Sequence, residues 1–324
     1  MDNRQAQGRI PGLEVQPSPL FFGTATAPVM TGEEAAFDLL DGVLASGVNA
    51  FDCARSYGKA EETLGRWIRE RGCRDRIVLM TKGGDIRDGK VEVNRQVIRQ
   101  QLATSLQTLQ TDCIDLYLLH RDDPNTPVEE LVDTLNEARQ AGQIRLFGVS
   151  NWTCRRIEEA NRYAARNGLE GISASSPNFG LARQMKDLWG GGCVTLSGPE
   201  NEGARAWYRE NRMPVIAYSS LGRGFFSGRF RAGDYEGAQR VLDSYARTGY
   251  LYEENMARLK RAEEMAERYG VTVPEIAMRY IFGSGMNLYA VVSTTSVERL
   301  KMNLRAANQP LTRDEAEYLE GTEA

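Results

Sequence analysis

IDLYLLH, residues 114–120, is a short and almost wholly apolar run that ends on His120, the one histidine of the chain. Two earlier runs have the same form, since VNAFD ends on Asp52 and IVLMTK ends on Lys82. Tyr57 follows Asp52 closely, in FDCARSYG. The strands of a parallel barrel bring polar groups together at their carboxyl ends. These runs therefore predict three strands that deliver four polar side chains to one site.

Runs of this kind recur eight times, and amphipathic stretches such as PVEELVDTLNEARQAG lie between them. The runs begin at Leu20, Val48, Ile77, Ile114, Ile144, Gly171, Val215 and Leu288. Eight strands that alternate with helices predict an α/β fold, a (β/α)8 TIM barrel that forms a single domain over residues 1–324. Gly12 in RIPGLEVQP suggests a hairpin within residues 1–17, which we expect to cap the bottom of the barrel. Two long connections, 180–200 and 229–255, are expected on the active-site face.

The charge, the hydropathy and the cysteine content argue against several classes of protein. Basic and acidic residues leave a net charge of −4 without a basic block, so nucleic acid is not an expected partner. No apolar run is long enough to span a membrane, and the N-terminus MDNRQAQGRI lacks the apolar core of a secretory signal. The five cysteines are scattered without a CxxC, which predicts reduced thiols in a cytoplasmic protein. With a single histidine, no metal site is expected.

The four polar residues suit the reduction of a carbonyl group. Tyrosine is a weak acid, and a lysine ammonium beside Tyr57 lowers its pKa. Asp52 would pair with Lys82 and keep it charged, so that Tyr57 could donate a proton to a carbonyl oxygen. His120 would hydrogen-bond the same oxygen, as a second donor towards the developing alkoxide. Taken singly, each residue has an ordinary structural explanation. Their common position at strand ends favours the catalytic one.

Several motifs in order resemble those of the aldo-keto reductase family. FDCARSYGKAEETLG is similar to the Asp–Tyr motif of that family, LMTKGG to its lysine strand and DLYLLHRDDP to its histidine strand. Further similar segments are GRIPGLEV, GVSNW, AYSSLGRG and SVERLKMN. The resemblance runs from about Gly8 to Asn303. It implies a catalytic tetrad of Asp52, Tyr57, Lys82 and His120, with Tyr57 as the general acid.

The same resemblance implies a nicotinamide cofactor. Ser150 and Asn151 would bind its carboxamide, Tyr218 would stack on the nicotinamide ring, and the loop 219–224 would hold the pyrophosphate. The implied cofactor-binding residues are Gly23, Thr24, Asp52, Ser150, Asn151, Ser175, Tyr218, Ser219, Leu221, Gly222, Arg223, Gly224, Ser293, Thr294, Thr295, Arg299 and Asn303. Arg299 would contact a 2′-phosphate, which favours NADP (as NADPH) over NAD. Two departures from the family pattern are Ser175, where many members have Gln, and the cation-free run STTS.

The substrate is expected to be a small carbonyl compound, for which sugar-derived or other polar aldehydes and ketones are candidates. Its expected contacts are Tyr57, His120, Trp152 and Trp189. Trp189, beside three glycines, is interpreted as a mobile flap or as a residue packed on the barrel exterior. Two alternatives to an NADP-dependent reductase stay open: a cofactor-binding regulatory or redox-sensing protein of the same fold, and an unrelated barrel enzyme. The sequence indicates neither the oligomeric state nor the direction of the reaction.

Overall fold

The computed structural model describes residues 8–86 and 89–322 of the chain. Its eight strands, β1 to β8, are parallel neighbours in the order of a closed barrel, which confirms the predicted (β/α)8 fold. The chain divides into two compact units. Unit 1 contains Met1–Ser176 with Ser293–Val297, and unit 2 contains Pro177–Val292 with Glu298–Ala324. The single domain expected from the sequence stays a prediction.

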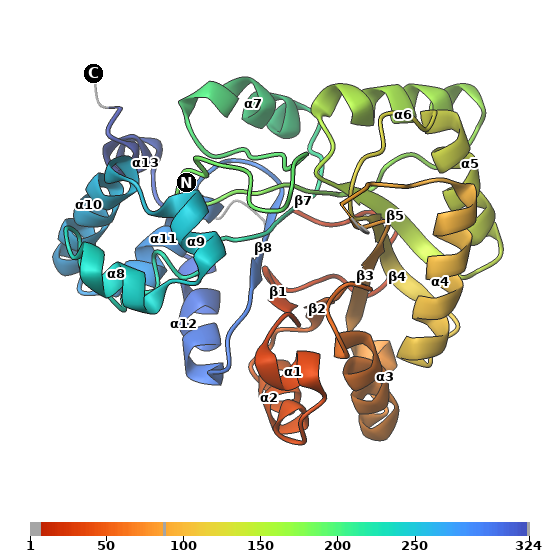
Figure 1. The fold of residues 1–324 in the computed structure, drawn as a ribbon, viewed down its shortest axis with the longest axis horizontal. Helices are drawn as coiled ribbons and strands as arrows, with labels where there is room; N and C mark the ends of the chain where they lie inside the picture. Colours follow the sequence, from red (N-terminus) through yellow and green to blue (C-terminus); the bar gives the residue numbers. More distant parts are fainter. Residues whose placement is uncertain (1–7, 87–88, 323–324) are drawn as a thin grey trace, which may run out of the picture. The chain divides into compact units, whose positions relative to one another are not determined.

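Unit 1 holds the first six strands, and Figure 1 shows helices α2 to α6 on the outside of them. Its elements are β1 (Leu20–Gly23), α1 (Ala27–Thr31), α2 (Ala35–Ala45), β2 (Ala50–Asp52), α3 (Ala60–Arg71), η1 (Arg74–Arg76), β3 (Val78–Gly83), α4 (Arg95–Leu109), β4 (Ile114–Leu119), α5 (Val128–Gln140), β5 (Ile144–Ser150), α6 (Cys154–Arg166) and β6 (Ser175–Ser176). All eight predicted runs contain a strand, although the sixth is reduced to two residues.

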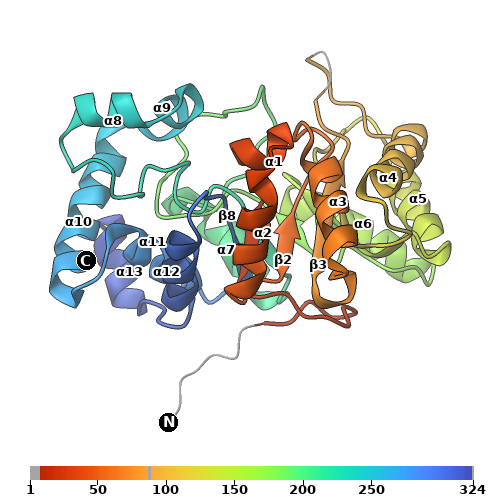
Figure 2. The same cartoon turned by 90° about the horizontal axis from the view of Figure 1, so that it is seen from below.

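The apolar runs form strands because both of their faces are covered. Every residue of β3 and β4 is buried. A parallel strand needs this composition, since side chains alternate between the barrel interior and the layer of helices. On the helical side, Phe51 of β2 packs against Trp67 of α3 with ring centroids 5.2 Å apart. Figure 2 shows α2 and α3 side by side along β2 and β3.

The N-terminal segment differs from the predicted hairpin. Part of the prediction, residues 1–7, lies outside the described residues. Residues 8–17 form a turn at Pro11–Gly12 but no strand. Side-chain hydrogen bonds hold this turn in place of a ladder, because the Gln16 amide donates to the carbonyls of Ile10 and Leu13. The segment contacts the beginning of β5, where Gly12 lies against the side chain of Leu146.

Unit 2 holds the last two strands and most of the C-terminal helices. Its elements are η2 (Pro199–Asn201), α7 (Glu202–Glu210), β7 (Val215–Ala217), α8 (Tyr235–Val241), α9 (Ser244–Tyr250), α10 (Glu253–Tyr269), α11 (Val273–Phe282), β8 (Leu288–Val292), α12 (Val297–Ala307), whose first residue belongs to unit 1, and α13 (Arg313–Glu320). The connection predicted at 229–255 contains two short helices, α8 and α9. Asp234 and Asp243 cap these helices by accepting backbone N–H groups.

Two buried arginines hold the ends of the long connection between β6 and α7. Arg258 of α10 donates to the carbonyl of Leu181. Arg205 of α7 donates to the carbonyls of Leu196 and Gly198. A buried arginine needs acceptors for its donors, and here backbone carbonyls supply some of them while Glu254 pairs with Arg258 and Glu202 with Arg205. The two ends of the connection are therefore fixed, and its middle carries Trp189.

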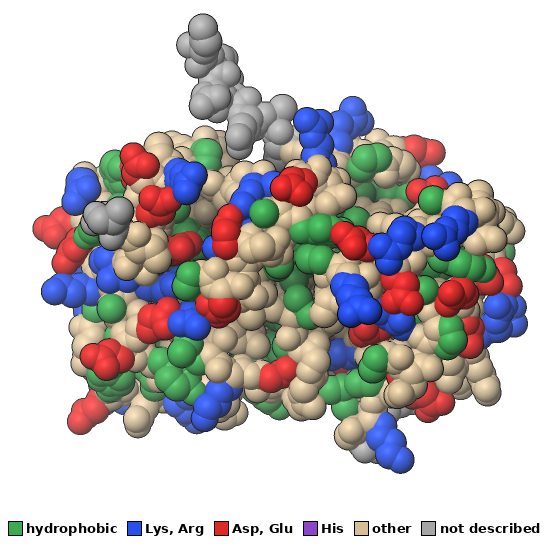
Figure 3. All heavy atoms as spheres, turned by 90° about the horizontal axis from the view of Figure 1, so that it is seen from above, with side chains coloured by type: hydrophobic (Ala, Val, Ile, Leu, Met, Phe, Trp, Pro, Cys, Tyr) green, Lys and Arg blue, Asp and Glu red, His purple; other side chains and the backbone are tan. Residues whose placement is uncertain are grey.

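The surface carries both signs of charge. Figure 3 shows basic and acidic side chains interspersed over one face. Among the described residues, no helix is long and apolar enough to cross a membrane.

Candidate active site

Three adjacent strands of unit 1 position the four residues predicted to be catalytic. Asp52 is the last residue of β2 and Lys82 lies in β3. His120 follows β4 directly, and its backbone N–H donates to the carbonyl of Gly83 at 2.7 Å. Tyr57 lies in the connection between β2 and α3. The strand register pairs Lys82 with Leu118, so the ends of β3 and β4 lie level with each other.

Lys82 and Asp52 form a buried ion pair. Each residue is 3% exposed. The Lys82 ammonium donates to Asp52 Oδ1 and, at 2.9 Å, to the carbonyl of Cys53. Burial raises the pKa of Asp52 and, taken alone, lowers the pKa of Lys82. The ion pair favours the charged form of each residue. The pKa of Lys82 therefore stays above its usual value. Lys82 is therefore a fixed positive charge inside unit 1.

Tyr57 lies between the other members of this group. The Lys82 ammonium is 5.1 Å from the centre of the Tyr57 ring, and the His120 ring lies edge-on at 6.0 Å. Burial raises the pKa of Tyr57, Lys82 lowers it and Asp52 raises it, with a result of about 12. Lys82 thus acts in the predicted direction, but desolvation outweighs it. In this structure Tyr57 is a neutral phenol that retains its proton at neutral pH.

The loop that carries Tyr57 is attached to the neighbouring strand. The backbone N–H of Arg55 donates to the carbonyl of Lys82 at 3.0 Å. The Arg55 side chain forms an ion pair with Glu61 of α3, which also accepts a 2.7 Å hydrogen bond from the Thr81 hydroxyl. Gly58 has a φ of 56°, and a Cβ there would lie 2.9 Å from the carbonyl oxygen of Met30. These contacts set the position of Tyr57.

His120 faces a carboxylate that the sequence analysis did not single out. Its Nδ1 lies 3.3 Å from Asp85 Oδ2, although the contact lacks the geometry of a hydrogen bond. Burial lowers the pKa of His120, Lys82 lowers it further and Asp85 raises it, with a result of about 3. His120 is therefore a neutral imidazole at neutral pH. Asp85 follows Lys82 by three residues in the motif TKGGD, a pattern typical of a turn that does not by itself predict a contact with His120.

Several residues implied to hold a cofactor line the ends of the unit 1 strands. Thr24, directly after β1, donates to the carbonyl of Asp52 through both its N–H and its hydroxyl, each at 2.9 Å. The Ser150 hydroxyl donates to the carbonyl of Ser176 at 2.8 Å. The Asn151 amide donates to Ser150 Oγ at 3.1 Å and to the carbonyl of His120 at 3.3 Å. Ser175 is fully buried. Hydrogen bonds therefore connect Thr24 to the backbone of Asp52 at the end of β2, and Asn151 to the backbone of His120.

The residues implied to hold the adenosine end of the cofactor lie before and within α12. Ser293 and Thr295 are exposed, and Thr294 accepts from the N–H of Ser296 at 3.1 Å. Arg299 is exposed on α12. Asn303 is 3% exposed, and its Oδ1 is buried without a hydrogen-bond partner among the described residues. A buried acceptor of this kind normally has a donor.

In unit 2 the loop 219–224 follows β7 and Tyr218. Its backbone is tightly turned, with positive φ angles at Ser219, Gly222, Arg223 and Gly224. Gly222 packs closely, because a Cβ there would lie 2.7 Å from the Cβ of Ala182. Leu221 accepts from the N–H of Gly224. Glycine at 222 is therefore explained by packing as well as by a turn.

An aromatic cluster lies next to this loop. Trp189 meets Tyr218 edge-on at 5.7 Å and stacks on Tyr245 at 6.3 Å. The Arg223 guanidinium lies over both Trp189 and Tyr245, at 5.5 and 5.4 Å from the ring centres. It also pairs with Asp243 at 2.6 Å, while its Nε is buried without a partner among the described residues. Trp189 is thus half-buried, and it contacts Arg223 of the loop 219–224.

Trp152 has little surface with which to contact a substrate. It is 1% exposed, its indole N–H donates to the carbonyl of Arg121 at 3.3 Å, and Arg156 covers its ring. Its predicted contact with substrate stays a prediction.

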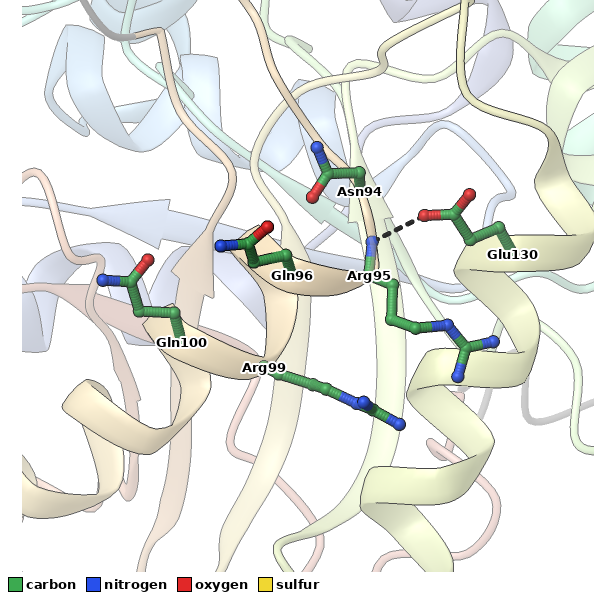
Figure 4. Close-up of a pocket in the computed structure, with 6 residues that line it drawn as sticks. All are labelled: Asn94, Arg95, Gln96, Arg99, Gln100 and Glu130. Carbon is green, nitrogen blue, oxygen red and sulfur yellow. Dashed lines mark hydrogen bonds between the residues drawn. The ribbon is translucent and has the colours of Figure 1, made fainter.

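A surface pocket of unit 1 lies on a different part of the structure. Figure 4 shows it at the first turn of α4, where the N–H of Arg95 donates to Glu130 Oε1 of α5 at 2.8 Å. Its lining residues are Asn94, Arg95, Gln96, Arg99, Gln100 and Glu130. None of them belongs to the predicted tetrad. Asn94 is the N-cap of α4 and accepts from the N–H of Val97, so the polar groups at this position are explained by helix capping.

Comparison with known proteins places the whole barrel in one family. The sequence model of the Aldo/keto reductase family matches residues 19–324. The chain is 28% identical to the aldo-keto reductase str7 of Strobilurus tenacellus, over 89% of this chain and 80% of the relative. It is 27% identical to the NADP(+) aldo-keto reductase yakc of Schizosaccharomyces pombe, over 87% and 80%. It is also 27% identical to a probable aryl-alcohol dehydrogenase, AAD4, of Saccharomyces cerevisiae, over 89% and 87%.

Proposed function

Since this chain belongs to the aldo/keto reductase family and is an oxidoreductase of that family, we propose that it reduces an aldehyde or ketone to an alcohol with NADPH. Tyr57 is the general acid, and Asp52, Lys82 and His120 complete the site. The observation that carries this proposal is the position of Tyr57, whose ring centre lies 5.1 Å from the Lys82 ammonium and 6.0 Å from the centre of the His120 ring. A single acid beside a fixed positive charge is what carbonyl reduction requires.

The proton step follows from the charges of the site. A reduced nicotinamide cofactor, when bound, supplies the hydride to the carbonyl carbon. Tyr57 gives its proton to the carbonyl oxygen and becomes a phenolate. Burial opposes the phenolate, and a nearby positive charge offsets part of this cost, which leaves the pKa of Tyr57 at about 12. Lys82 supplies that charge, and Asp52 keeps Lys82 protonated and in place.

Two buried polar atoms that have no hydrogen-bond partner among the residues the structure describes support the proposed cofactor site. The buried Oδ1 of Asn303 is an acceptor that suits an adenine amino group, and the buried Nε–H of Arg223 is a donor that suits a phosphate oxygen. We propose that Ser150 and Asn151 hold the carboxamide, that the loop 219–224 holds the pyrophosphate and that Arg299 contacts a 2′-phosphate. The name of the yakc relative carries NADP(+), which favours NADP over NAD for this chain as well.

The proposal also covers the cellular location of the protein and the class of its substrate. All five cysteines are free, which supports a cytoplasmic protein. We propose a small carbonyl compound as the substrate, and sugar-derived and other polar aldehydes and ketones are the first compounds to screen.

Replacing the proposed acid tests the function. We expect Tyr57→Phe to lower kcat for carbonyl reduction by about 10²- to 10⁴-fold, because the proton donor is lost. Binding of NADPH, followed by nicotinamide fluorescence, should stay nearly unchanged. Tyr117→Phe is the matched control, since the Tyr117 hydroxyl is buried without a hydrogen-bond partner in the described part of the chain and its loss should leave turnover as it was. Equal turnover in Tyr57→Phe and the parent protein would remove Tyr57 as the acid.

The preference for NADPH over NADH is tested by measuring the binding of each cofactor. Separate titrations with NADPH and NADH should give tighter binding of NADPH, and Arg299→Ala should weaken NADPH more than NADH. Equal weakening of both would place Arg299 away from the 2′-phosphate, and no binding of either would contradict the oxidoreductase assignment of this site.

A further inference from the structure

Tyr250, the last residue of α9, is a fully buried phenol in unit 2. Its hydroxyl accepts a 3.0 Å hydrogen bond from the Asn178 amide and lies 3.4 Å from Gln184 Oε1, to which it donates. A hydrogen bond with the Ser219 side chain also acts on it. A phenol hydroxyl has one proton to donate and can accept two, so these three partners use its whole capacity. The hydroxyl therefore joins three separate segments of unit 2 to the end of α9.

The Tyr250 hydroxyl keeps its proton in these surroundings. Burial raises its pKa to about 12, although the hydrogen bonds with Ser219 and Asn178 lower it. The group is therefore neutral at neutral pH, and its contacts are those of a neutral phenol. A neutral hydroxyl whose donor and acceptor positions are all occupied holds its neighbours in place rather than transferring a proton.

The ring of Tyr250 lies beside the other end of the turn that begins at Ser219. The Gly222 N–H donates to the Ser219 carbonyl at 2.7 Å and closes this turn. A Cβ at position 222 would lie 3.8 Å from Tyr250 Cδ1, so the ring packs next to the glycine. The hydroxyl at Ser219 and the ring at Gly222 place Tyr250 in contact with both ends of the turn.

The loop 219–224 has a backbone that needs such support. Ser219 and Arg223 have φ angles of 55° and 52°, in the left-handed region. This conformation is unfavourable for a residue with a Cβ, and it persists only where surrounding contacts determine it. The shape of the loop therefore depends on its neighbours, and Tyr250 is a neighbour that contacts it through both hydroxyl and ring.

Asn178 in turn fixes the Tyr250 hydroxyl. It is 1% exposed, and its Oδ1 accepts from the Thr195 hydroxyl at 2.8 Å. Its amide also donates to the carbonyl of Tyr218 at 3.4 Å, and its backbone N–H donates to the carbonyl of Val194 at 2.8 Å. Tyr218 directly precedes the turn. The polar group around Tyr250 thus also holds the residue from which the loop 219–224 departs.

We propose that Tyr250 is a positioning residue for the cofactor, which holds the turn Ser219–Gly222 in the shape that receives the pyrophosphate. This inference rests on the proposed function, in which the loop 219–224 binds that group. A turn that is already in its binding shape does not have to be ordered when the cofactor arrives, so its support contributes to affinity. The loss of Tyr250 then weakens cofactor binding and leaves the proton transfer from Tyr57 unchanged.

Tyr250→Phe tests the support directly, because it removes the hydroxyl and keeps the ring. Hydrogen exchange of the cofactor-free protein, followed by mass spectrometry, should show faster exchange in the segment 219–224. Tyr252→Phe is the matched control. It removes a phenol hydroxyl two residues away, which donates to the carbonyl of Thr248 at 3.0 Å, and it should leave this exchange unchanged. Equal exchange in Tyr250→Phe and the parent protein would overturn the proposal without any binding measurement.

Binding measurements then test the pyrophosphate. In Tyr250→Phe the Kd of NADPH should rise about tenfold, the effect of losing one buried hydrogen-bonding group, while kcat at saturating NADPH stays near that of the parent. Adenosine 2′-monophosphate lacks the pyrophosphate, so its Ki against NADPH should not change. Equal weakening of both ligands would indicate general damage to unit 2 and would reject the positioning role.

A second variant tests whether Tyr250 acts through the turn. Glycine adopts the left-handed conformation without penalty and lacks the Ser219 hydroxyl. Tyr250→Phe should therefore raise the Kd of NADPH much less in a Ser219→Gly background than in the parent. The same fold-change in both backgrounds would contradict a route through Ser219. Faster exchange in 219–224 without any loss of NADPH affinity would instead reject this loop as the pyrophosphate site, so the two failures can be told apart.

Discussion

Lys82 and Asp52 illustrate how far chemistry at single residues was predictable. Their pairing follows from two neighbouring parallel strands, in which Lys82 lies two residues beyond Met80, the register partner of Asp52, and the structure places both residues at 3% exposure. The direction in which the pKa of Tyr57 finally shifts could not be predicted from the sequence. Proximity to Lys82 lowers it as expected, but the larger contribution is burial, which depends on every atom packed around the hydroxyl.

Asp85 was missed for a related reason. An aspartate in a glycine-containing segment is usually a turn residue, so TKGGD gives no reason to prefer a contact with His120. That contact depends on where the chain runs after β3.

The buried ion pair leads to a prediction at this scale. Lys82→Met leaves the Asp52 carboxylate buried without a partner, so the free energy of unfolding should fall by about 3–5 kcal/mol. The double variant Asp52→Asn with Lys82→Met removes both charges and should recover most of that loss. Carbonyl reduction should stay low in both. Urea unfolding followed by tryptophan fluorescence measures the stability. A double variant as unstable as Lys82→Met alone would contradict an ion-pair origin.

Strand positions were predicted well at the scale of elements because a parallel strand needs a continuous apolar run. The helices between β7 and β8 were not all predicted. The helices α8 and α9 are seven residues long and contain Gly237 and Gly249, so they show little amphipathic periodicity. The predicted hairpin also failed in residues 8–17, where side-chain hydrogen bonds from Gln16 replace strand pairing.

The two glycines that flank α3 allow a matched prediction for one element. Gly58 and Gly72 have nearly equal φ angles, 56° and 55°, but a Cβ at position 58 would lie 2.9 Å from the Met30 carbonyl oxygen, and one at 72 has open space. Gly72→Ala should cost about 1–2 kcal/mol from the backbone alone. Gly58→Ala should cost more and should also lower kcat, because it displaces the Tyr57 loop. Thermal unfolding and steady-state kinetics check both. Equal effects of the two variants would show that the Met30 contact does not position Tyr57.

For the molecule as a whole, the single histidine makes acid stability informative. His120 has its pKa lowered to about 3 in the folded state, against about 6.5 in an unfolded chain. Below about pH 6.5 the unfolded chain binds a proton that the folded chain does not. The stability from this group is therefore complete above that pH and is lost as the pH falls.

We accordingly predict that stability falls between about pH 6.5 and pH 5 with a slope approaching 1.4 kcal/mol per pH unit, because other side chains titrate little in this window. His120→Asn removes the titrating group and should flatten the curve. Denaturant unfolding at a series of pH values measures both slopes. A parent protein and a His120→Asn variant with equal slopes would contradict a buried neutral imidazole.

The sequence by itself determined the alternation of strands and helices, the order of the barrel strands and the placement of Asp52, Lys82 and His120 at strand ends, with Tyr57 shortly after one of them. Each of these follows from local periodicity and from the direction of a parallel strand. Only the tertiary structure decided which groups surround those residues: the burial that raises the pKa of Tyr57, the Asp85 carboxylate that faces His120, and the aromatic cluster around Arg223. Desolvation and contact between distant segments depend on packing in three dimensions, and no pattern along the chain encodes them alone.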